Sequence, residues 1–406
     1  MSTIAFLNIA MRGHVNPTLP VVAELVRRGH SVTYHTSPAF AKEIEATGAT
    51  VHRYPESDRP LPDPPTPVTL LDALARTALD VLPAVLSELR RVRPDLIVHG
   101  STCPWGAVAA RELGVPAASS FTTFAFNRHT PSPTHASREL LTAAATSPRN
   151  VRSYTRSRWE LYRRYDTRGL PLHDWANIRQ PLNLVYTSSA FQPGAGTFDA
   201  SYRFVGPSIG ARPPDPSFPA DHLRAPVLYA SLGTLIDSGR LLRDFAVGLA
   251  PLGGTVIIST GHTDPAALGP LPANVLARRF LPQLEVLERA ALFVTHGGMN
   301  SVNEAMYAGV PMLVVPHAAD QPLVARRVAE LGVGLSIRPQ DAAAEAVHAL
   351  ARRLLDEPRF KAAAATLQVA QREAGGYLRA ADELERRLRR FTRATRPGLA
   401  DSPRER

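Results

Sequence analysis

The segment FLPQLEVLERAALFVTHGGMNSVNEAMYAGVPMLVVPHAADQ, residues 280–321, contains the change of pattern that decides the fold. Residues 292–295 are a short apolar run typical of a buried strand, and a histidine and two glycines follow at 296–298. Apolar residues then recur at helical spacing until Gly-Val-Pro at 309–311 ends the pattern. The glycines therefore lie where a strand gives way to a helix.

Such a junction predicts a site for a diphosphate. Free backbone N–H groups and the positive end of the helix dipole point at one spot there. Glu304, about one turn into the helix, could reach the diol of a ribose. A second strand at 312–316 delivers Asp320 and Gln321 to the same edge, where open α/β sheets bind ligands.

The rest of the chain alternates strands and helices in the same way. Residues 4–36 form a βαβ unit without the G-x-G-x-x-G pattern, which argues against a dinucleotide oxidoreductase. Strands are expected at 4–10, 31–36, 50–54, 95–99, 117–120, 182–187, 202–205, 227–231, 255–259, 275–279, 292–295 and 312–316, and helices at 18–28, 40–46, 70–91, 105–113, 153–165, 241–249, 302–308, 321–331, 342–356, 358–373 and 377–392. The fold class is therefore α/β.

Interruptions of this alternation suggest the domain boundaries. The proline-rich stretch 56–67 is expected to be a loop, and 121–181 is an irregular insert of the kind that often carries binding loops. Five prolines in 206–224 indicate a linker. We expect a first domain at 1–205, a second at 225–378, a final helix at 379–393 and a disordered tail at 394–406.

Composition excludes several classes of protein. The 406 residues are 44% hydrophobic and 20% charged, as in a soluble globular protein of two domains. The first strand begins near residue 3, which leaves no room for a signal peptide and predicts a cytoplasmic protein. A single cysteine, Cys103, excludes an internal disulfide. The net charge of +10 comes from scattered arginines, so we expect no nucleic-acid partner and no stable membrane insertion.

The combined motifs closely resemble the signature of family-1 glycosyltransferases of the GT-B fold, in particular the bacterial macrolide and natural-product type. The motifs are GHVNP at 13–17, FLPQ at 280–283, HGGMNS at 296–301, GVPM at 309–312 and DQ at 320–321. The resemblance implies two Rossmann-like domains that face each other across a cleft, with the acceptor on the first domain, the nucleotide sugar on the second, and the last helix crossing back to the first.

The function implied by the resemblance is antibiotic or other natural-product biosynthesis. A sugar would pass from a UDP- or dTDP-sugar to a hydrophobic small-molecule acceptor with inversion, without a cofactor. Metal-dependent transferases hold the diphosphate through carboxylates, and the chain has no Asp-x-Asp, so we expect metal independence. The oligomeric state stays open.

The resemblance also assigns donor-binding residues. Phe280 would stack on the nucleobase, although an aromatic residue at a strand end is also typical of a core. His296 and the following amides would hold the diphosphate, Glu304 the ribose, and the Asp320-Gln321 pair the sugar, while Asp320 also suits a helix N-cap. The expected set is Gly13, Ser231, Thr234, Phe280, Gln283, His296, Gly297, Gly298, Asn300, Ser301, Glu304, Asp320 and Gln321.

His14, on the loop after the first strand, is the expected general base, with the alternative that it only caps the helix that follows or fills the wall of the cleft. In the family an Asp holds this histidine, but Gly100 occupies the matching place here. Three explanations stand: Ser101 or Thr102 orients His14, the acceptor is a readily activated phenol, amine or electron-rich carbon, or the protein is slow or inactive. A catalytically silent nucleotide-binding partner of another transferase is therefore the alternative function, and a GT-B epimerase is a third.

Aromatic residues of the insert could line an apolar acceptor pocket, although most aromatic residues simply belong to the core. The expected acceptor-binding residues are Phe121, Phe124, Phe126, Trp159 and Tyr162.

Overall fold

The chain folds into two compact α/β units, each of which is described by itself. The computed structural model describes residues 1–54, 66–130, 142, 145–172, 174–212, 215–233 and 238–395. The first unit comprises residues 1–186, 196–208 and 375–406, and the second comprises 187–195 and 209–374. Residues 187–195, which the sequence analysis placed in the first domain, thus pack with the second unit. The prediction of two Rossmann-like domains is confirmed.

The first unit is built on a parallel sheet whose strand order reverses at its centre. In spatial order the strands are β3 (Thr50–Arg53), β2 (Ser31–Thr36), β1 (Thr3–Leu7), β4 (Leu96–Gly100), β5 (Ala117–Phe121), β6 (Asn183–Val185) and β7 (Tyr202–Phe204). The chain runs outward in one direction from β1 and in the other from β4. In open α/β sheets, ligands bind beyond the carboxyl ends of the two strands at such a switch point.

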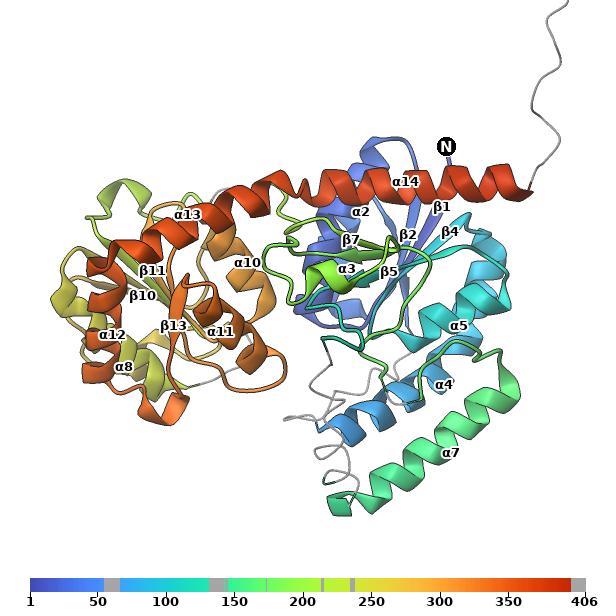
Figure 1. Cartoon of the computed structure of the whole chain (residues 1–406), viewed down its shortest axis with the longest axis horizontal. Coiled ribbons are helices and arrows are strands. Elements are labelled where there is room, and N and C mark those ends of the chain that lie inside the picture. Colours follow the sequence, from blue (N-terminus) through green and yellow to red (C-terminus); the bar gives the residue numbers. More distant parts are fainter. Residues whose placement is uncertain are drawn as a thin grey trace, which may run out of the picture. The chain divides into compact units, whose positions relative to one another are not determined.

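Helices cover both faces of this sheet, so successive residues of β1 enter different cores. Ile4 and Phe6 pack with α2 (Leu19–Arg27) and α14 (Gly376–Thr395), whereas Ala5 and Leu7 face the other core. That second core includes α4 (Pro67–Val92), α5 (Pro104–Glu112) and α7 (Pro148–Arg164), with α7 lying on the outer side of α4 (Figure 1). Strands buried on both faces explain the continuous apolar runs in the sequence.

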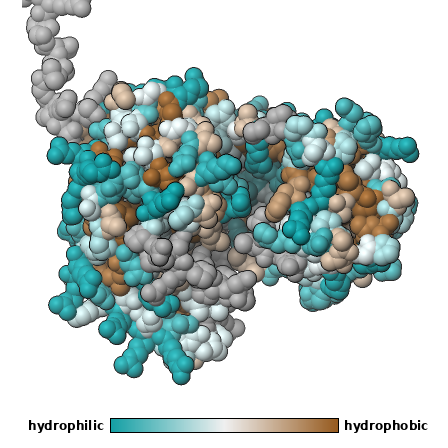
Figure 2. Space-filling view, turned by 180° about the vertical axis from the view of Figure 1, so that it is seen from behind, coloured by the Kyte–Doolittle hydropathy of each residue, from teal (hydrophilic) through white to brown (hydrophobic). Residues whose placement is uncertain are grey.

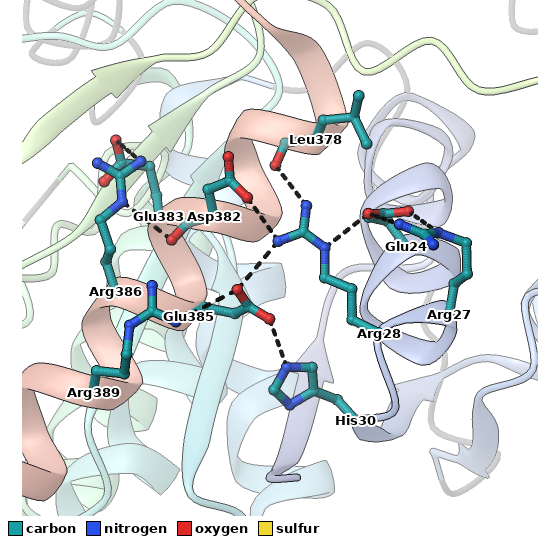
Figure 3. A network of polar contacts seen from close by, with 10 residues as sticks. All are labelled: Glu24, Arg27, Arg28, His30, Leu378, Asp382, Glu383, Glu385, Arg386 and Arg389. Carbon is teal, nitrogen blue, oxygen red and sulfur yellow. Dashed lines mark hydrogen bonds and ion pairs between the residues drawn. The ribbon is translucent and has the colours of Figure 1, made fainter.

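The C-terminal helix α14 docks on α2 through an apolar stripe and a charged network (Figure 3). Leu384 and Leu388 are buried in the core that α2 lines. Beside them Arg28, at the end of α2, contacts Glu24 at 2.7 Å, Asp382 at 2.7 Å and Glu385 at 3.2 Å. One guanidinium therefore connects an acid on its own helix with two acids on α14.

The second unit repeats the same architecture with six parallel strands. In spatial order they are β10 (Val275–Arg278), β9 (Thr255–Ser259), β8 (Val227–Ser231), β11 (Ala290–Thr295), β12 (Met312–Val314) and β13 (Gly334–Ser336). The order reverses between β8 and β11. Tyr229 and Phe293, from these two central strands, stack with ring centroids 4.7 Å apart.

The helices of the second unit again lie on both faces of the sheet. One face carries α8 (Gly239–Leu249) and α12 (Ala344–Asp356). The other helices are α9 (Gln283–Leu287), α10 (Met299–Ala308), which packs against α13 (Pro358–Glu373), and α11 (Gln321–Glu330), which packs against β13. The switch point therefore lies between β8 and β11, at the start of α10.

Some predicted boundaries are corrected by the structure. The first strand ends at Leu7 rather than residue 10, because the chain bends at Ala10 and then forms the short helix α1 (Arg12–Val15). The segment 41–45 forms α3 (Ala41–Glu45) as expected. The predicted tail began at residue 394, but α14 continues through Thr395. Most of the loop expected at 56–67 lies outside the described residues, and α4 already begins at Pro67.

Within the described residues, no helix is both long and apolar enough to cross a bilayer. On the face shown in Figure 2, hydrophobic residues form separate small groups within a largely hydrophilic surface.

Candidate functional site

His14 lies at the switch point of the first sheet. It belongs to α1, which follows β1, the central strand that pairs with β4. The neighbouring Gly13 is exposed, and a Cβ at this position would meet no protein atom within 4 Å. The loop therefore leaves open space beside the histidine backbone.

The imidazole of His14 is partly buried and contacts one hydroxyl. Its Nδ1 lies 3.2 Å from Oγ1 of Thr122, which directly follows β5. Burial of the ring lowers the pKa of His14 to about 4, because the charged form loses its hydration. The side chain is therefore neutral at physiological pH and can accept a proton.

Thr122 was not among the residues expected to orient His14. The sequence analysis named Ser101 and Thr102, which follow β4 and are buried. The hydrogen bond to the imidazole comes instead from the end of the next strand, β5. Sheet order could have suggested this residue, because the carboxyl ends of neighbouring parallel strands lie at the same edge.

Gly100 occupies the position at which the family resemblance implied a carboxylate, and the side chain of Asn8 fills the space beside it. A Cβ on Gly100 would lie 2.4 Å from Oδ1 of Asn8, closer than atoms can approach. The Asn8 side chain donates from Nδ2 to the backbone carbonyl of His14 at 2.8 Å. Asn8 thus holds the backbone of His14, whereas Thr122 contacts its ring.

In the second unit, His296 lies at the corresponding switch point, among three glycines. It follows β11, and Cβ atoms on Gly233 and Gly298 would lie 2.8 and 2.4 Å from its ring. Gly297 adopts φ +86°, a conformation that favours glycine, and a Cβ there would lie 2.7 Å from Val314. Burial, with a smaller effect of the nearby His317, lowers the pKa of His296 to about 4. The turn therefore packs around a neutral imidazole.

The anion site was predicted at the N-terminus of α10. Gly298 is its N-cap, and Asn300 and Ser301 lie in the first turn. Ser231, at the end of β8, accepts a hydrogen bond at Oγ from the backbone of Gly233 at 3.2 Å. Two strand ends and the start of a ten-residue helix thus meet at the switch point. Their binding of a diphosphate stays a prediction.

Glu304, expected at a ribose, is buried and already has protein partners. Its carboxylate accepts a hydrogen bond from Nε2 of Gln283 at 2.6 Å and forms an ion pair with Arg212. Gln283 also lies 3.3 Å from Oγ of Ser301. Arg212 lies in the segment expected to be a linker, and nothing in the sequence pattern marked it as part of the site.

The remaining donor-side residues differ in how they are held. Phe280 is 59% exposed, which contradicts the alternative of a core residue, and its ring meets that of His262 edge to face with centroids 6.0 Å apart. Asp320 is the N-cap residue of α11, although its side chain forms no capping hydrogen bond. Oε1 of Gln321 accepts from the backbone N–H of His317 at 2.8 Å. Thr234 lies outside the described residues.

The five aromatic residues expected to bind the acceptor fall into two groups, and their contact with an acceptor stays a prediction. Phe121, Phe124 and Phe126 are at most 5% exposed and belong to the interior. Trp159 and Tyr162 project from α7 and are 58% and 70% exposed. Composition alone could not separate these groups, because burial depends on which face of an element meets the core.

The described residues contain no candidate metal centre. Among them, no three or more His, Cys, Asp or Glu side chains are grouped so as to hold a metal ion. The polar groups at the start of α10 are an imidazole, an amide, a hydroxyl and backbone N–H groups.

Comparisons with known proteins give a consistent result. Residues 247–374 match the family model of the erythromycin biosynthesis protein CIII-like C-terminal domain. The chain is 32% identical to the NDP-glycosyltransferase YjiC of Bacillus subtilis, covering 94% of this chain and 96% of that protein. It is also 32% identical to the oleandomycin glycosyltransferase of Streptomyces antibioticus, over 98% of this chain and 95% of that one. The crystal structure of the glycotransferase of kitacinnamycin has a TM-score of 0.84 at 29% identity and covers 95% of this chain and 98% of its own.

Proposed function

Because the chain belongs to the family-1 glycosyltransferases of the natural-product type, an enzyme class of GT-B fold, we propose that it transfers a sugar from a UDP- or dTDP-sugar to a hydrophobic small-molecule acceptor with inversion. The names of two relatives support such a donor and acceptor, namely the NDP-glycosyltransferase YjiC and the oleandomycin glycosyltransferase. We further propose that the first unit binds the acceptor and the second binds the donor.

His14 is the proposed general base. The observation that carries this proposal is the position of its neutral imidazole beyond the central strand β1, beside the open space at Gly13. In the proposed reaction, His14 takes the proton of the acceptor nucleophile as that atom bonds to the anomeric carbon. The bond from this carbon to the nucleoside diphosphate breaks on the opposite face, so the anomeric configuration inverts.

The proposed donor site is the turn around His296. The first amides of α10 and the side chains of Asn300 and Ser301 would hydrogen-bond the diphosphate, whose charge the helix dipole also stabilises. Phe280 would stack on the base. Glu304 would meet the ribose, and the ion pair with Arg212 would then have to rearrange.

We propose that this donor site needs no divalent ion. The support is the chemistry of its polar groups, because imidazole, amide, hydroxyl and N–H groups can bind the diphosphate oxygens directly. Treatment with EDTA should leave turnover within about twofold, with added Mg²⁺ as the comparison. A loss of activity that Mg²⁺ restores would contradict this part of the proposal.

The experiment that tests the function is release of free UDP or dTDP from a panel of sugar donors, with phenol, amine and alcohol acceptors. The His14→Ala variant should retain nucleotide binding in calorimetry and lose at least about a hundredfold in turnover. Because no carboxylate of the described residues contacts the imidazole, a silent nucleotide-binding role is the second candidate. Nucleotide binding without turnover of any acceptor would favour it.

A further inference from the structure

The surroundings of His14 differ from a histidine and carboxylate pair in a way that constrains its chemistry. The place of the carboxylate is not vacant, because a Cβ on Gly100 would lie 2.4 Å from Oδ1 of Asn8. Asn8 itself is fixed on several sides. Its Oδ1 accepts from the N–H of Ile9 at 3.0 Å, and its backbone carbonyl accepts from the hydroxyl of Tyr54 at 3.1 Å. A residue larger than glycine at position 100 therefore requires the side chain of Asn8 to move.

Asn8 supports the loop but not the imidazole. Its Nδ2 donates to the carbonyl oxygen of His14 at 2.8 Å and lies 3.4 Å from the hydroxyl of Tyr34. The ring is contacted instead by Thr122, whose Oγ1 lies 3.2 Å from Nδ1. Two separate residues thus fix the backbone and the ring of the same histidine.

A hydroxyl differs from a carboxylate as a partner for Nδ1 in two respects. It can donate as well as accept, so it does not impose the tautomer in which Nε2 is free to take a proton. It also carries no charge, so it gives little support to the imidazolium that forms as the acceptor is deprotonated. Burial also disfavours the charged ring and so lowers the pKa of His14.

We propose that Thr122 is the positioning residue of His14, and that the pairing of Asn8 with Gly100 excludes a carboxylate and thereby restricts the enzyme to acceptors with an acidic nucleophile, such as phenols. The second clause rests on the proposed glycosyltransferase function. A phenol has a pKa of about 10, as in tyrosine, whereas an aliphatic alcohol lies near the value of about 15.7 for water. A weakly supported imidazole can assist the first nucleophile far more readily than the second.

The positioning role is tested on the free protein by ¹⁵N NMR of its histidines, with His14→Gln used to assign the resonance. Thr122→Val should shift the Nδ1 resonance of His14, and Thr122→Ser should restore it. Thr122→Asp should raise the pKa of His14 by at least about one unit, because a carboxylate favours the imidazolium. Thr47→Val, which removes a hydroxyl bonded to a backbone carbonyl on α3, is the control. An Nδ1 resonance that Thr122→Val leaves unchanged would overturn the assignment.

The acceptor class is tested by kcat/KM for a series of phenols of graded pKa and matched alkyl alcohols. The wild type should prefer phenols by at least about a hundredfold, and Thr122→Val should lower kcat more than it raises KM. Thr122→Asp should reduce the preference for phenols over alcohols at least about tenfold. The double variant Asn8→Ala, Gly100→Asp should show the same reduction when it is compared with Asn8→Ala alone. Equal use of phenols and alcohols by the wild type would overturn the acceptor restriction. Absence of all turnover would contradict the proposed function and leave the NMR result to decide the role of Thr122.

Discussion

At the scale of single residues, two histidines at strand ends have different surroundings. His14 has open space beside Gly13, whereas His296 is enclosed by Gly233 and Gly298. The first arrangement suits a group that must approach a substrate and exchange a proton. The second suits a ring that supports a turn while the neighbouring amides face a ligand.

The enclosure of His296 leads to a prediction for Gly298→Ala. The new Cβ would lie 2.4 Å from Nε2 of His296, so the ring must move away from the start of α10. The dissociation constant for UDP or dTDP should rise at least about tenfold in calorimetry, with little change in melting temperature, since the ring is the end of a side chain. Gly196→Ala is the matched control, because a Cβ there meets no atom within 4 Å. Unchanged affinity in Gly298→Ala would separate His296 from the donor site.

The lowered pKa of His14 predicts the acid limb of the pH profile. A general base must be neutral, and burial keeps His14 neutral down to about pH 4 instead of the ordinary 6.5. With a saturating donor and a phenol acceptor, kcat/KM should therefore stay nearly constant from pH 7 to about pH 5 and fall below it. Thr122→Asp should move this limb to higher pH. A limb near pH 6.5 in the wild type would show that the ring is hydrated in the working enzyme.

The residues around His14 also show what the sequence could and could not predict. His14, Gly100 and His296 were identified correctly as residues at strand ends, because a strand followed by glycine and a helix is a local pattern. Thr122 was missed, since it approaches His14 only in the folded sheet. Asn8 was missed because no sequence pattern marks its bond to the carbonyl of His14, six residues later. The steric conflict at Gly100 likewise depends on contact between β1 and β4, which no local pattern contains.

At the scale of secondary-structure elements, periodicity predicted the existence of helices better than their partners. The family resemblance implied that the last helix returns to the first domain, and Leu384 and Leu388 of α14 lie in the core of the first unit. The aromatic residues of the insert were harder, because Trp159 lies on the outer face of α7 while Phe121 ends a central strand. Hydrophobicity alone cannot distinguish these positions.

The docking of α14 predicts a strong effect of Arg28→Ala. Its guanidinium is 20% exposed and contacts Glu24, Asp382 and Glu385, so its removal leaves a buried acid on α2 and two acids on α14 without this partner (Figure 3). The free energy of unfolding should fall by about 1.5–3 kcal/mol, the range for hydrogen bonds to charged groups. Denaturant unfolding would measure the loss.

Arg27→Ala is the matched control for this network. Arg27 also contacts Glu24, at 2.7 Å, but its side chain is 72% exposed and its ion pair is screened by water. Its removal should have a clearly smaller effect than that of Arg28. Equal losses for both variants would show that the stabilisation comes from Glu24 alone and not from the connection to α14.

At the scale of the whole molecule, each unit has one of the two proposed site histidines at the reversal of strand order. His14 follows β1 in one sheet and His296 follows β11 in the other. The same topological rule therefore explains why two segments nearly 300 residues apart in the chain carry the motifs of one enzyme family. The sequence predicted two parallel sheets because alternating strands and helices form them, and this alternation does not depend on the identity of the surface side chains.

Buried histidines in both units also predict acid sensitivity of the fold. Burial lowers the pKa of His35 to about 3 and those of His99 and His296 to about 4. Below pH 6.5 the unfolded chain binds protons that the folded chain does not, so stability is lost as the pH falls from about 6.5 toward 4. Each histidine contributes up to about 1.4 kcal/mol per pH unit in this window.

Melting temperatures should therefore fall steeply between pH 6.5 and pH 5, above the range in which ordinary carboxylates titrate. His35→Phe should flatten this dependence, because phenylalanine does not titrate and can keep the stacking on His52, whose ring centroid lies 4.9 Å away. His222→Gln, at an exposed position, is the control and should leave the slope unchanged. A pH dependence that His35→Phe does not alter would mean that His35 takes up its proton within the folded unit, with Glu88, whose charge favours the protonated ring, as the compensating group.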